Sequence, residues 1–365
     1  MGEAVSAACF ESVAIGAARY RYRTLFLSVD PFLRCRFDAS TGVDYTAPYE
    51  RGGVLQSAGL AVDEQMRQVV VQAFDSWPWA THVSQAPPQT IPVPAPLGLV
   101  VSPTHLLGAL GTTGLTAYCG IVTHAPVGPG DVLVVSGAAG AVGHLVGQIA
   151  KSRGASFVVG ICGSDEKGRI LQEHCGFDVV VNRRSSNFAH LLREALEGRR
   201  VSHYFDNAGG AVSDAVISCM DENSTVILCG QIDSYNRTSD VGYPPPLPDE
   251  TANLVKERSI RRDRYLVLNY QLHFPAALAE LSQLIASGKL KALETVTPGG
   301  VEAAPTAFIN MMAGQNMGKA LVACDSNFPL KWKIANWMRE NVLPRSVKGI
   351  MARSFLSQST WKDMM

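Results

Sequence analysis

The sequence predicts an α/β protein that combines a doubly wound parallel sheet of the Rossmann type with a second, β-rich domain. Residues 132–135 form a short, continuous apolar segment, which is typical of a strand buried on both faces of a parallel sheet. Strand-like and helix-like segments then alternate as far as residue 229, and right-handed crossovers turn that order into a parallel sheet. Short strand patterns lie between residues 24 and 80, and the length of 365 residues favours two domains.

Composition and charge argue against several classes of protein. The formal net charge is zero, so no global positive field favours a nucleic-acid partner. The eight cysteines stand singly, without a C-x-x-C motif or a Cys/His cluster, which argues against disulfides and a structural zinc site. The chain has no apolar segment of about eighteen residues, which argues against stable membrane insertion. We therefore expect a cytoplasmic protein in a reducing compartment.

The first third of the chain contains the strand patterns of the β-rich domain. Residues 24–36 begin with a strand pattern, and an Asp-Pro pair ends this strand because proline cannot donate to the ladder. Two further apolar strands are predicted at 54–62 and 69–74. A proline-rich connection follows, and residues 106–121 then show a helix pattern interrupted by glycines.

The glycine-rich turn after residues 132–135 is the strongest candidate for binding a dinucleotide. It reads SGAAGAVG and opens a helix whose apolar residues recur at helical spacing. Gly140 and Gly143 carry no side chain, so the backbone N–H groups at the helix start can approach an anionic pyrophosphate. The match to the dinucleotide fingerprint is loose, because Ala138 stands where the commonest form has its first glycine. A purely structural strand-to-helix loop is the alternative.

The second strand of the sheet favours NADPH over NADH. Residues 156–163 are again apolar, and they end without the acidic residue that an NAD enzyme usually carries there for the ribose hydroxyl. Lys167 and Arg183 follow, and both are candidates for binding a 2′-phosphate. The alternative for Lys167 is a solvated charge on a helix.

The later strands place further residues at the carboxyl edge of the sheet, where ligands bind in doubly wound folds. Residues 201–205 lead into a turn that contains Asn207, and residues 225–229 lead into the segment 230–235. We therefore expect Asn207 and residues 231–235 on the cofactor rim. The elements predicted beyond the sheet are a strand at 265–270, helices at 278–285 and 307–312, and a last strand at 320–323.

Residues 326–365 differ from the rest of the chain. Trp332, Ile334, Trp337 and Met338, with an excess of lysine and arginine over acidic residues, indicate a basic amphipathic helix. Such a helix could touch a membrane surface or a partner. We favour the alternative that the segment is an alternative exon or a mispredicted gene end that the fold does not use.

Several motifs occur together in one order: SVDPFLRCR, GLTAYCG, GAAGAVG, YFDNAGG, ILCGQIDSYN, YPPPL, YLVLNY and GQNMGK. With this combination the chain resembles the zinc-independent medium-chain dehydrogenases/reductases, and among them the prostaglandin reductases that act on 15-oxoprostaglandins. The resemblance implies NADPH-dependent reduction of the carbon–carbon double bond of an α,β-unsaturated ketone. It also implies a small enone lipid as substrate, no metal, and a monomer or homodimer.

The resemblance implies a domain organisation as well. A GroES-like, β-rich catalytic domain is assembled from residues 1–122 and 268–325, and the Rossmann domain, residues 123–267, is inserted between them. Residues 326–365 form an atypical basic tail with no counterpart in the family.

Matching the family motifs residue by residue assigns a candidate site. The resemblance implies that Tyr235 and Tyr45 approach the reacting enone. The substrate contacts it implies are Phe74, Asp75, Ser76, Leu266, Val267 and Leu268. The NADPH contacts it implies are Gly140, Ala141, Val142, Gly143, Lys167, Asn207, Cys229, Gly230, Gln231, Ile232, Asp233, Ser234, Tyr235, Tyr265, Leu266, Val267 and Asn316.

A phenol suits the chemistry of this reaction. A conjugated ketone accepts a hydride at its β-carbon, and negative charge then gathers on the carbonyl oxygen as an enolate. A tyrosine hydroxyl, together with the ribose hydroxyl of the cofactor, can donate hydrogen bonds to that oxygen without a metal. We favour Tyr235 for this role because it lies in the loop after a Rossmann strand; the alternative is a rim tyrosine that only packs.

Departures from the family pattern leave the substrate open. Arg183 replaces a tyrosine, which favours a bidentate contact with the 2′-phosphate. The segment around Phe74 carries an extra residue, and residues 53–71 lack the expected Gly-Asp turn. The alternatives are therefore a general alkenal/one or quinone reductase, and an NADPH-binding protein impaired in catalysis.

Overall fold

The computed structural model describes residues 20–38, 43, 45–236, 243–348 and 351. The chain divides into two compact units. We call the first the parallel-sheet unit; it contains Arg34–Tyr49 and Thr116–Asn269. We call the second the mixed-sheet unit; it contains Val5–Leu33, Glu50–Leu115 and Tyr270–Met365.

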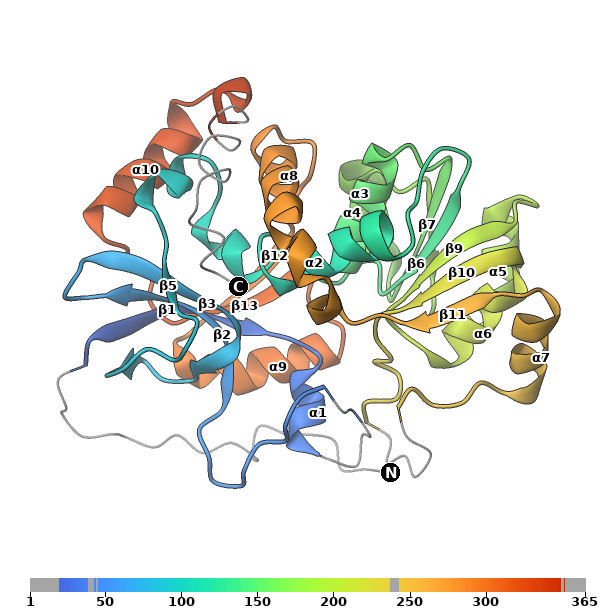
Figure 1. Ribbon diagram of the computed structural model, residues 1–365, viewed down its shortest axis with the longest axis horizontal. Helices are drawn as coiled ribbons and strands as arrows, with labels where there is room; N and C mark the ends of the chain where they lie inside the picture. The colour runs from blue at the N-terminus through green and yellow to red at the C-terminus, as the bar shows by residue number, and fades with distance from the viewer. Residues whose placement is uncertain (1–19, 39–42, 44, 237–242, 349–350, 352–365) are drawn as a thin grey trace. The chain divides into compact units, whose positions relative to one another are not determined.

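The parallel-sheet unit is a six-stranded sheet in the order β11-β10-β9-β6-β7-β8, with helices on both faces (Figure 1). Its strands are β6 (Val132–Ser136), β7 (Phe157–Cys162), β8 (Val179–Asn182), β9 (Val201–Asp206), β10 (Met220–Leu228) and β11 (Arg261–Arg264). Its main helices are α3 (Gly143–Ser152), α4 (Asp165–Cys175), α5 (Phe188–Leu196), α6 (Gly210–Ser218) and α7 (Asp249–Glu257).

All neighbouring strands of this sheet pair in parallel, and β6 lies between β7 and β9. The strand order therefore reverses at β6, and the carboxyl edge beside this switch point is where doubly wound sheets bind ligands. β6 is buried at every position, as its continuous apolar sequence predicted. The predicted fold class is confirmed.

Helix α3 packs closely against the loop before β8 because one of its positions is glycine. A Cβ at Gly147 would lie 2.1 Å from the ring of Phe177, which is nearer than any real contact. The apolar residues that the sequence placed on this helix, Leu145, Val146 and Ile149, are all fully buried. They contribute to the core between helix and sheet, where burial of each such side chain stabilises the fold by about 1.5–3 kcal/mol.

The strand predicted at 265–270 is wrong. The last strand of the sheet, β11, ends before it, and a 3-10 segment, η6 (Val267–His273), takes up most of these residues. Tyr265 is 4% exposed, its ring packs against Phe205, and its hydroxyl donates to the carbonyl of Thr116 over 3.0 Å. Some residues of this segment are thus buried, as they would be in a strand, but most of its backbone forms a helical turn.

The mixed-sheet unit contains a seven-stranded sheet, with the path β12-β13-β1-β2-β3-β5 and with β4 paired to β1. Its strands are β1 (Tyr22–Val29), β2 (Gln56–Asp63), β3 (Gln68–Pro78), β4 (His82–Val83), β5 (Ile91–Pro92), β12 (Glu294–Pro298) and β13 (Lys319–Ala323). Among the strand pairs of this sheet that the structure describes, β12–β13 is parallel and the others are antiparallel. The first strand of the unit thus pairs with the last one, Phe26 standing opposite Ala323.

The helical segments of this unit lie between and after these strands. They are η3 (Ala95–Leu99), η4 (Pro103–Leu107), α8 (Phe274–Ala286), η7 (Val301–Ala303), α9 (Ala304–Met312) and α10 (Leu330–Asn341). Two more helices cross the boundaries between the units, α1 (Leu33–Phe37) and α2 (Thr112–Cys119), and a π-helical turn, η5 (Gly120–His124), continues α2. The helix pattern predicted at 106–121 is therefore divided among three segments.

The basic tail begins with a helix that the fold does use. Trp332 of α10 is fully buried, and a Cβ at Gly98 of η3 would lie 2.9 Å from its ring. Arg339 donates to the carbonyls of Gly98 and Val101 over 3.2 Å and 2.7 Å. The interpretation that this segment contributes nothing to the fold is therefore wrong for α10.

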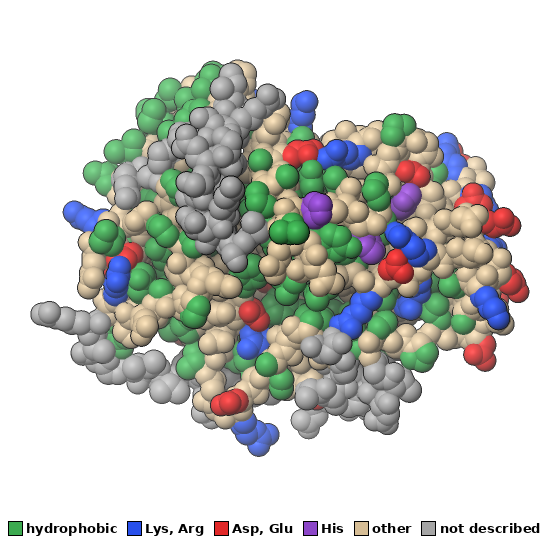
Figure 2. Space-filling view, in the orientation of Figure 1, with side chains coloured by type: hydrophobic (Ala, Val, Ile, Leu, Met, Phe, Trp, Pro, Cys, Tyr) green, Lys and Arg blue, Asp and Glu red, His purple; other side chains and the backbone are tan. Residues whose placement is uncertain are grey.

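The outer face of α10 is apolar. Leu330, Ile334 and Trp337 are exposed, and hydrophobic side chains gather on this helix in Figure 2. In the part of the chain that the structure describes, no helix has the length and hydropathy needed to cross a bilayer.

Candidate functional site

The turn between β6 and α3 is a backbone cradle that only glycine permits. Gly137 has a left-handed φ of +60°, and a Cβ at Gly143 would lie 2.3 Å from the carbonyl oxygen of Gly137. Burial lowers the pKa of His144 to about 4, so its imidazole is neutral, and its Nδ1 lies 2.7 Å from the carbonyl oxygen of Gly140. Gly140, Ala141, Val142 and Gly143 thus present backbone at the start of a helix, which suits a pyrophosphate.

A buried carboxylate organises the loops beside this cradle. Asp206, the last residue of β9, is fully buried, and Tyr204 and Ser213 donate to it over 2.8 Å and 2.6 Å. The backbone N–H groups of Ala208 and Gly209 also donate to it, over 3.0 Å and 2.9 Å. These four hydrogen bonds satisfy the buried carboxylate and hold the 206–209 turn in one conformation.

Two of the predicted cofactor residues are tied to this network. The side-chain amide of Gln231 donates to Asp206 over 3.1 Å, and the amide of Asn207 donates to the carbonyl of Ser136 over 2.8 Å. A Cβ at Gly209 would lie 2.3 Å from Oε1 of Gln231, and one at Gly210 would lie 2.5 Å from the carboxylate of Asp233. The double glycine of YFDNAGG therefore lets the loop after β10 close on the loop after β9.

Three cations gather at the ends of β7 and β8. Burial lowers the pKa of Lys167, and the neighbouring Arg184 lowers it further. Arg183 follows β8 directly, and its backbone N–H donates to the carbonyl of Cys162 over 2.8 Å. The guanidinium of Arg184 also approaches Gly163, since a Cβ there would lie 3.6 Å from its Nε. This group of residues suits a phosphate dianion; Arg184 was missed by sequence reasoning, although two consecutive arginines after a strand were a signal for it.

Tyr235 and Tyr45, the two predicted catalytic residues, lie together. Their side chains share a hydrogen bond, and both belong to the parallel-sheet unit. A third tyrosine, Tyr243, also hydrogen-bonds to Tyr235, and the centroids of their rings lie 6.4 Å apart. We call these three residues the phenol cluster. Tyr243 was not among the predicted site residues, although it is the first residue of the YPPPL motif.

All three phenols of the cluster keep their protons at neutral pH. Burial raises the pKa of Tyr235 well above its usual range, and it does the same for Tyr45. Burial raises the pKa of Tyr243 to about 12. Cys35 and Cys229 interact with the cluster, and burial raises the pKa of Cys229 to about 12, so that thiol is neutral as well. The site therefore offers neutral O–H donors in a poorly hydrated environment, where a developing oxyanion is stabilised most.

Comparison with known proteins identifies the family. The family model described as zinc-binding dehydrogenase matches residues 141–283. The chain is 34% identical over 311 residues to prostaglandin reductase 1 of Bos taurus, with 82% of this chain and 87% of that protein covered. The chain belongs to the zinc-binding dehydrogenase family.

Another relative is the NADPH-dependent curcumin reductase of Escherichia coli (strain K12). It is 31% identical over 313 residues, with 84% of this chain and 88% of that protein covered. Among solved structures, CurA from Vibrio vulnificus in complex with NADPH matches with a TM-score of 0.74 and 27% identity, covering 87% of this chain and 94% of that one. The predicted membership of the medium-chain dehydrogenases/reductases is confirmed.

The family name refers to zinc, which proteins bind through grouped His, Cys, Asp and Glu side chains. Within the described ranges, no three or more His, Cys, Asp and Glu side chains are grouped so that they could hold a metal ion.

The remaining predicted site residues fall into two groups. Tyr265 and Val267 are buried in the parallel-sheet unit, Leu266 is half-buried, and Leu268 is 37% exposed. Phe74 and Ser76 lie in β3 of the mixed-sheet unit, with Asp75 between them. The backbone N–H groups of Phe74 and Ser76 donate to Oε1 of Gln72 over 3.0 Å and 3.4 Å. Roles in binding substrate stay predictions for these residues.

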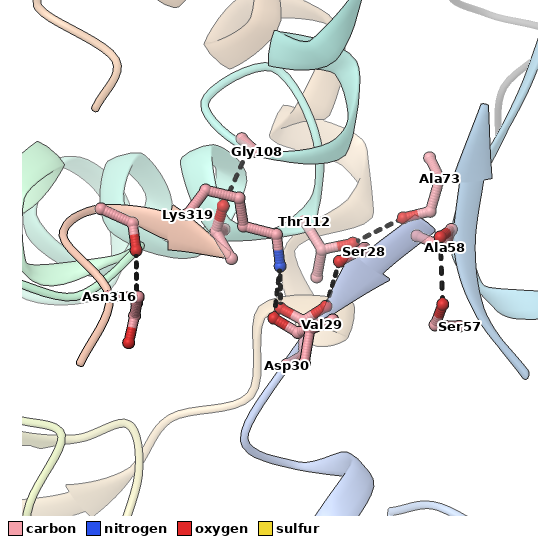
Figure 3. Close-up of polar contacts among 12 residues, drawn as sticks. Ser28, Val29, Asp30, Ser57, Ala58, Ala73, Gly108, Thr112, Asn316 and Lys319 are labelled. Carbon is pink, nitrogen blue, oxygen red and sulfur yellow. Dashed lines mark hydrogen bonds and ion pairs between the residues drawn. The ribbon is translucent and has the colours of Figure 1, made fainter. Parts of the chain in front are cut away.

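Asn316 also belongs to the mixed-sheet unit, beside a buried ion pair that sequence reasoning missed (Figure 3). The side-chain amide of Asn316 donates to the carbonyl of Gly318 over 2.7 Å, within the turn that leads into β13. At the start of that strand, Lys319 is 2% exposed and forms an ion pair with Asp30. Asp30 also accepts a hydrogen bond from Ser28, so this pair connects the beginning of β13 with the end of β1.

Proposed function

We propose that this protein reduces the carbon–carbon double bond of α,β-unsaturated ketones with NADPH. The phenol cluster is the observation that carries the proposal, because three neutral, hydrogen-bonded hydroxyls in a buried site can donate to a developing enolate. The relatives support this proposal, since they include prostaglandin reductase 1 and an NADPH-dependent curcumin reductase, and the solved CurA structure contains NADPH.

The residues of the parallel-sheet unit fit NADPH. The glycine cradle at Gly140–Gly143 would receive the pyrophosphate at the start of α3. Lys167, Arg183 and Arg184 would hold the 2′-phosphate through charge-assisted hydrogen bonds. The loop after β10, residues 229–235, would lie along the nicotinamide end, held in place by Asp206. Bound NADPH supplies the hydride.

The chain's own contribution to the chemistry is a hydrogen bond at the carbonyl oxygen. As hydride adds to the β-carbon, the π electrons of the double bond move toward the carbonyl and form an enolate. Tyr45 and Tyr235 would stabilise that oxyanion, and one such preorganised donor lowers the activation free energy by about 3 kcal/mol. A proton from water then reaches the α-carbon and completes the saturated ketone.

Within this reaction we propose 15-oxoprostaglandins as substrates. Cys35 after SVDP, the three prolines 244–246 and the VLNY segment favour prostaglandin reductase 2, the 15-oxoprostaglandin 13-reductase, over the prostaglandin reductase 1 type. Phe74, Asp75, Ser76 and residues 266–268 are the proposed substrate contacts. The chain would work with a small enone lipid, as a monomer or a homodimer.

A substrate panel tests the proposal. We expect NADPH absorbance at 340 nm to fall with a 15-oxoprostaglandin, more slowly with a short alkenal, and least with a quinone. NADH in place of NADPH is the control for the phosphate site, and we expect it to react at least about tenfold less efficiently. Faster turnover of the quinone would favour a quinone reductase, and NADPH binding without consumption of any acceptor would show an impaired enzyme.

A further inference from the structure

Half of the exposed large apolar side chains that the structure describes lie in one short segment of the mixed-sheet unit. The other five are spread between residues 54 and 296. Single exposed apolar residues are common on protein surfaces, but a group of them marks a place where the protein meets an apolar partner. The five that lie together are Leu330, Ile334, Trp337, Val342 and Val347. Helix α10 and the turn after it are therefore a candidate docking surface.

Three of these side chains form one stripe along α10. Leu330, Ile334 and Trp337 follow one another at intervals of four and three residues, which places them on one face of an α-helix. They are 73%, 50% and 60% exposed. At 1.5 Å per residue, the stripe is about 10 Å long. We call these three residues the outer stripe.

The opposite side of α10 is fixed to the body of the unit. Trp332 and Ala335 lie on the far side of the helix from the outer stripe, and both are buried. The ring of Trp332 packs against Gly98 and lies 6.5 Å from the ring of Phe328, measured between centroids. Arg339, on the same side, donates to two main-chain carbonyls. The helix cannot turn to bury the outer stripe without losing these contacts, so the stripe stays at the surface.

Cations border the outer stripe. Residues 330–348 contain five lysines and arginines but one acidic residue, Glu340. Lys333 and Arg345 are exposed, and Lys348 is half-buried. Glu340 forms an ion pair with Arg339 over 3.2 Å, which offsets its charge. The surface therefore combines an apolar stripe with an excess of positive charge.

This combination is typical of a helix that lies on a membrane surface. Such helices place apolar side chains among the lipids, often with a tryptophan at the interface, and keep lysines and arginines at the headgroups. Protein interfaces, in contrast, are depleted of lysine. At twelve residues α10 is too short to span a bilayer, which takes about twenty, so the contact would be peripheral.

We propose that the outer stripe docks on the surface of a membrane that contains anionic phospholipids. The helix axis lies in the plane of the membrane, with Ile334 and Trp337 at the boundary between headgroups and acyl chains. Lys333 and Arg345 meet the negative charge of the headgroups. The buried side of α10 keeps its contacts with the unit, so docking requires no unfolding of the helix.

Co-sedimentation of the full-length protein with lipid vesicles tests the charge requirement. Each cation near an anionic surface raises the affinity about fivefold. We expect binding to phosphatidylcholine vesicles with about 30% phosphatidylserine to be at least about 10-fold tighter than binding to pure phosphatidylcholine. The double variant Lys333→Gln/Arg345→Gln should bind the anionic vesicles about 20-fold more weakly. Equal binding to both kinds of vesicle, or binding to neither, would overturn the proposal.

A second pair of variants tests the apolar requirement. Trp337→Ala should weaken binding to the anionic vesicles at least about 10-fold, because a large side chain is no longer buried among the lipids. Leu272→Ala is the matched control, since Leu272 is 95% exposed in the same unit but lies in η6. It should bind like the unmodified protein. An equal loss in both variants would show that α10 is not the docking surface. Unchanged urea midpoints would show that neither variant is unfolded.

The fluorescence of Trp337 separates a lipid partner from other occupants of the stripe. Its emission is the difference between the unmodified protein and Trp337→Phe, which keeps an aromatic ring at this position. Without vesicles, acrylamide should quench this emission; protection would mean that a second copy or another segment of the chain covers the stripe, and would overturn the proposal. With anionic vesicles, brominated acyl chains should quench it. A failure of this quenching would overturn the proposal as well.

Discussion

At the scale of single residues, we propose that the choice of cofactor depends on three cations at the ends of β7 and β8. Lys167, Arg183 and Arg184 are close enough to affect one another or Cys162 electrostatically. Like charges so close together repel, and a bound phosphate would relieve that repulsion. The sequence already indicated Lys167 and Arg183 because the strand before them ends without an acidic residue. Arg184 needed the structure, since only its approach to Gly163 shows where its guanidinium lies.

We expect Arg184→Ala to lower kcat/KM for NADPH about 10- to 100-fold while that for NADH changes little. A charge-assisted hydrogen bond is worth about 1.5–3 kcal/mol. NADH lacks the 2′-phosphate that would accept this bond, so the substitution removes nothing from its binding. Arg193→Ala, an exposed arginine on α5, is the control and should leave both values unchanged. The same loss with both cofactors would show that Arg184 serves the fold and not the phosphate.

At the scale of elements, α10 shows how one amphipathic helix can present two apolar sides. Trp332 and Ala335 are buried against the mixed-sheet unit, and Trp337 is 60% exposed on the other side. The sequence predicted this helix from its tryptophans and its basic residues. The pattern did not reveal that one tryptophan fills a site beside Gly98, because a glycine in a proline-rich segment gives no sign of a partner more than two hundred residues away.

Trp332→Ala is expected to lower the free energy of unfolding by about 3–5 kcal/mol, because it leaves a large cavity next to Gly98. Trp337→Ala is the matched control on the same helix, and its effect should stay within about 0.5 kcal/mol. Urea unfolding of both variants measures the difference. Equal effects of the two substitutions would mean that α10 does not pack on the unit as described.

At the scale of the whole molecule, stability against pH should reflect two neighbouring groups with opposite shifts. Burial raises the pKa of Glu294 to about 7 and lowers the pKa of His105 to about 4. Nε2 of His105 lies 3.9 Å from Oε1 of Glu294. Oε2 of Glu294 accepts from Thr104 over 2.8 Å, while Oε1 of Glu294 and Nδ1 of His105 have no partner within the described chain. Near pH 6 both side chains are therefore neutral.

The signs of the two contributions are opposite. Between pH 4.5 and 7 the folded state binds more protons at Glu294 than the unfolded state, so this carboxyl makes stability fall as pH rises. Between pH 4 and 6.5 the unfolded state binds more protons at His105, so the imidazole makes stability rise. In the unmodified protein the two effects largely cancel.

We expect single substitutions to uncover each contribution. Relative to the unmodified protein, His105→Gln should lose about 2 kcal/mol of stability as pH rises from 5 to 7, because only the Glu294 effect is left. Glu294→Gln should gain a similar amount over the same range. Urea unfolding at several pH values measures both, and slopes of the same sign would refute the assignment.

The whole fold was more predictable than the details of its site. Continuous apolar strands followed by glycine turns predicted the parallel sheet, since those patterns are local. The turn at 265–270 looked like a strand because burial gives both structures the same apolar residues. Asp206 and Tyr243 were missed for another reason. Their importance comes from contacts with residues far apart in sequence, such as Gln231 and Arg264, which no spacing rule describes.

The pairing of β1 with β13 has a consequence for biosynthesis. The ribosome synthesises β1 early, yet one of its ladder partners, β13, is the last strand of the sheet to be made. The ion pair between Asp30 and Lys319, the first residue of β13, forms equally late. All six strands of the parallel sheet lie within residues 132–264, so this unit can complete its core during translation. Until β13 is made, the edge of β1 that it will cover has no ladder partner there, and such an open strand edge is a site where another chain can pair.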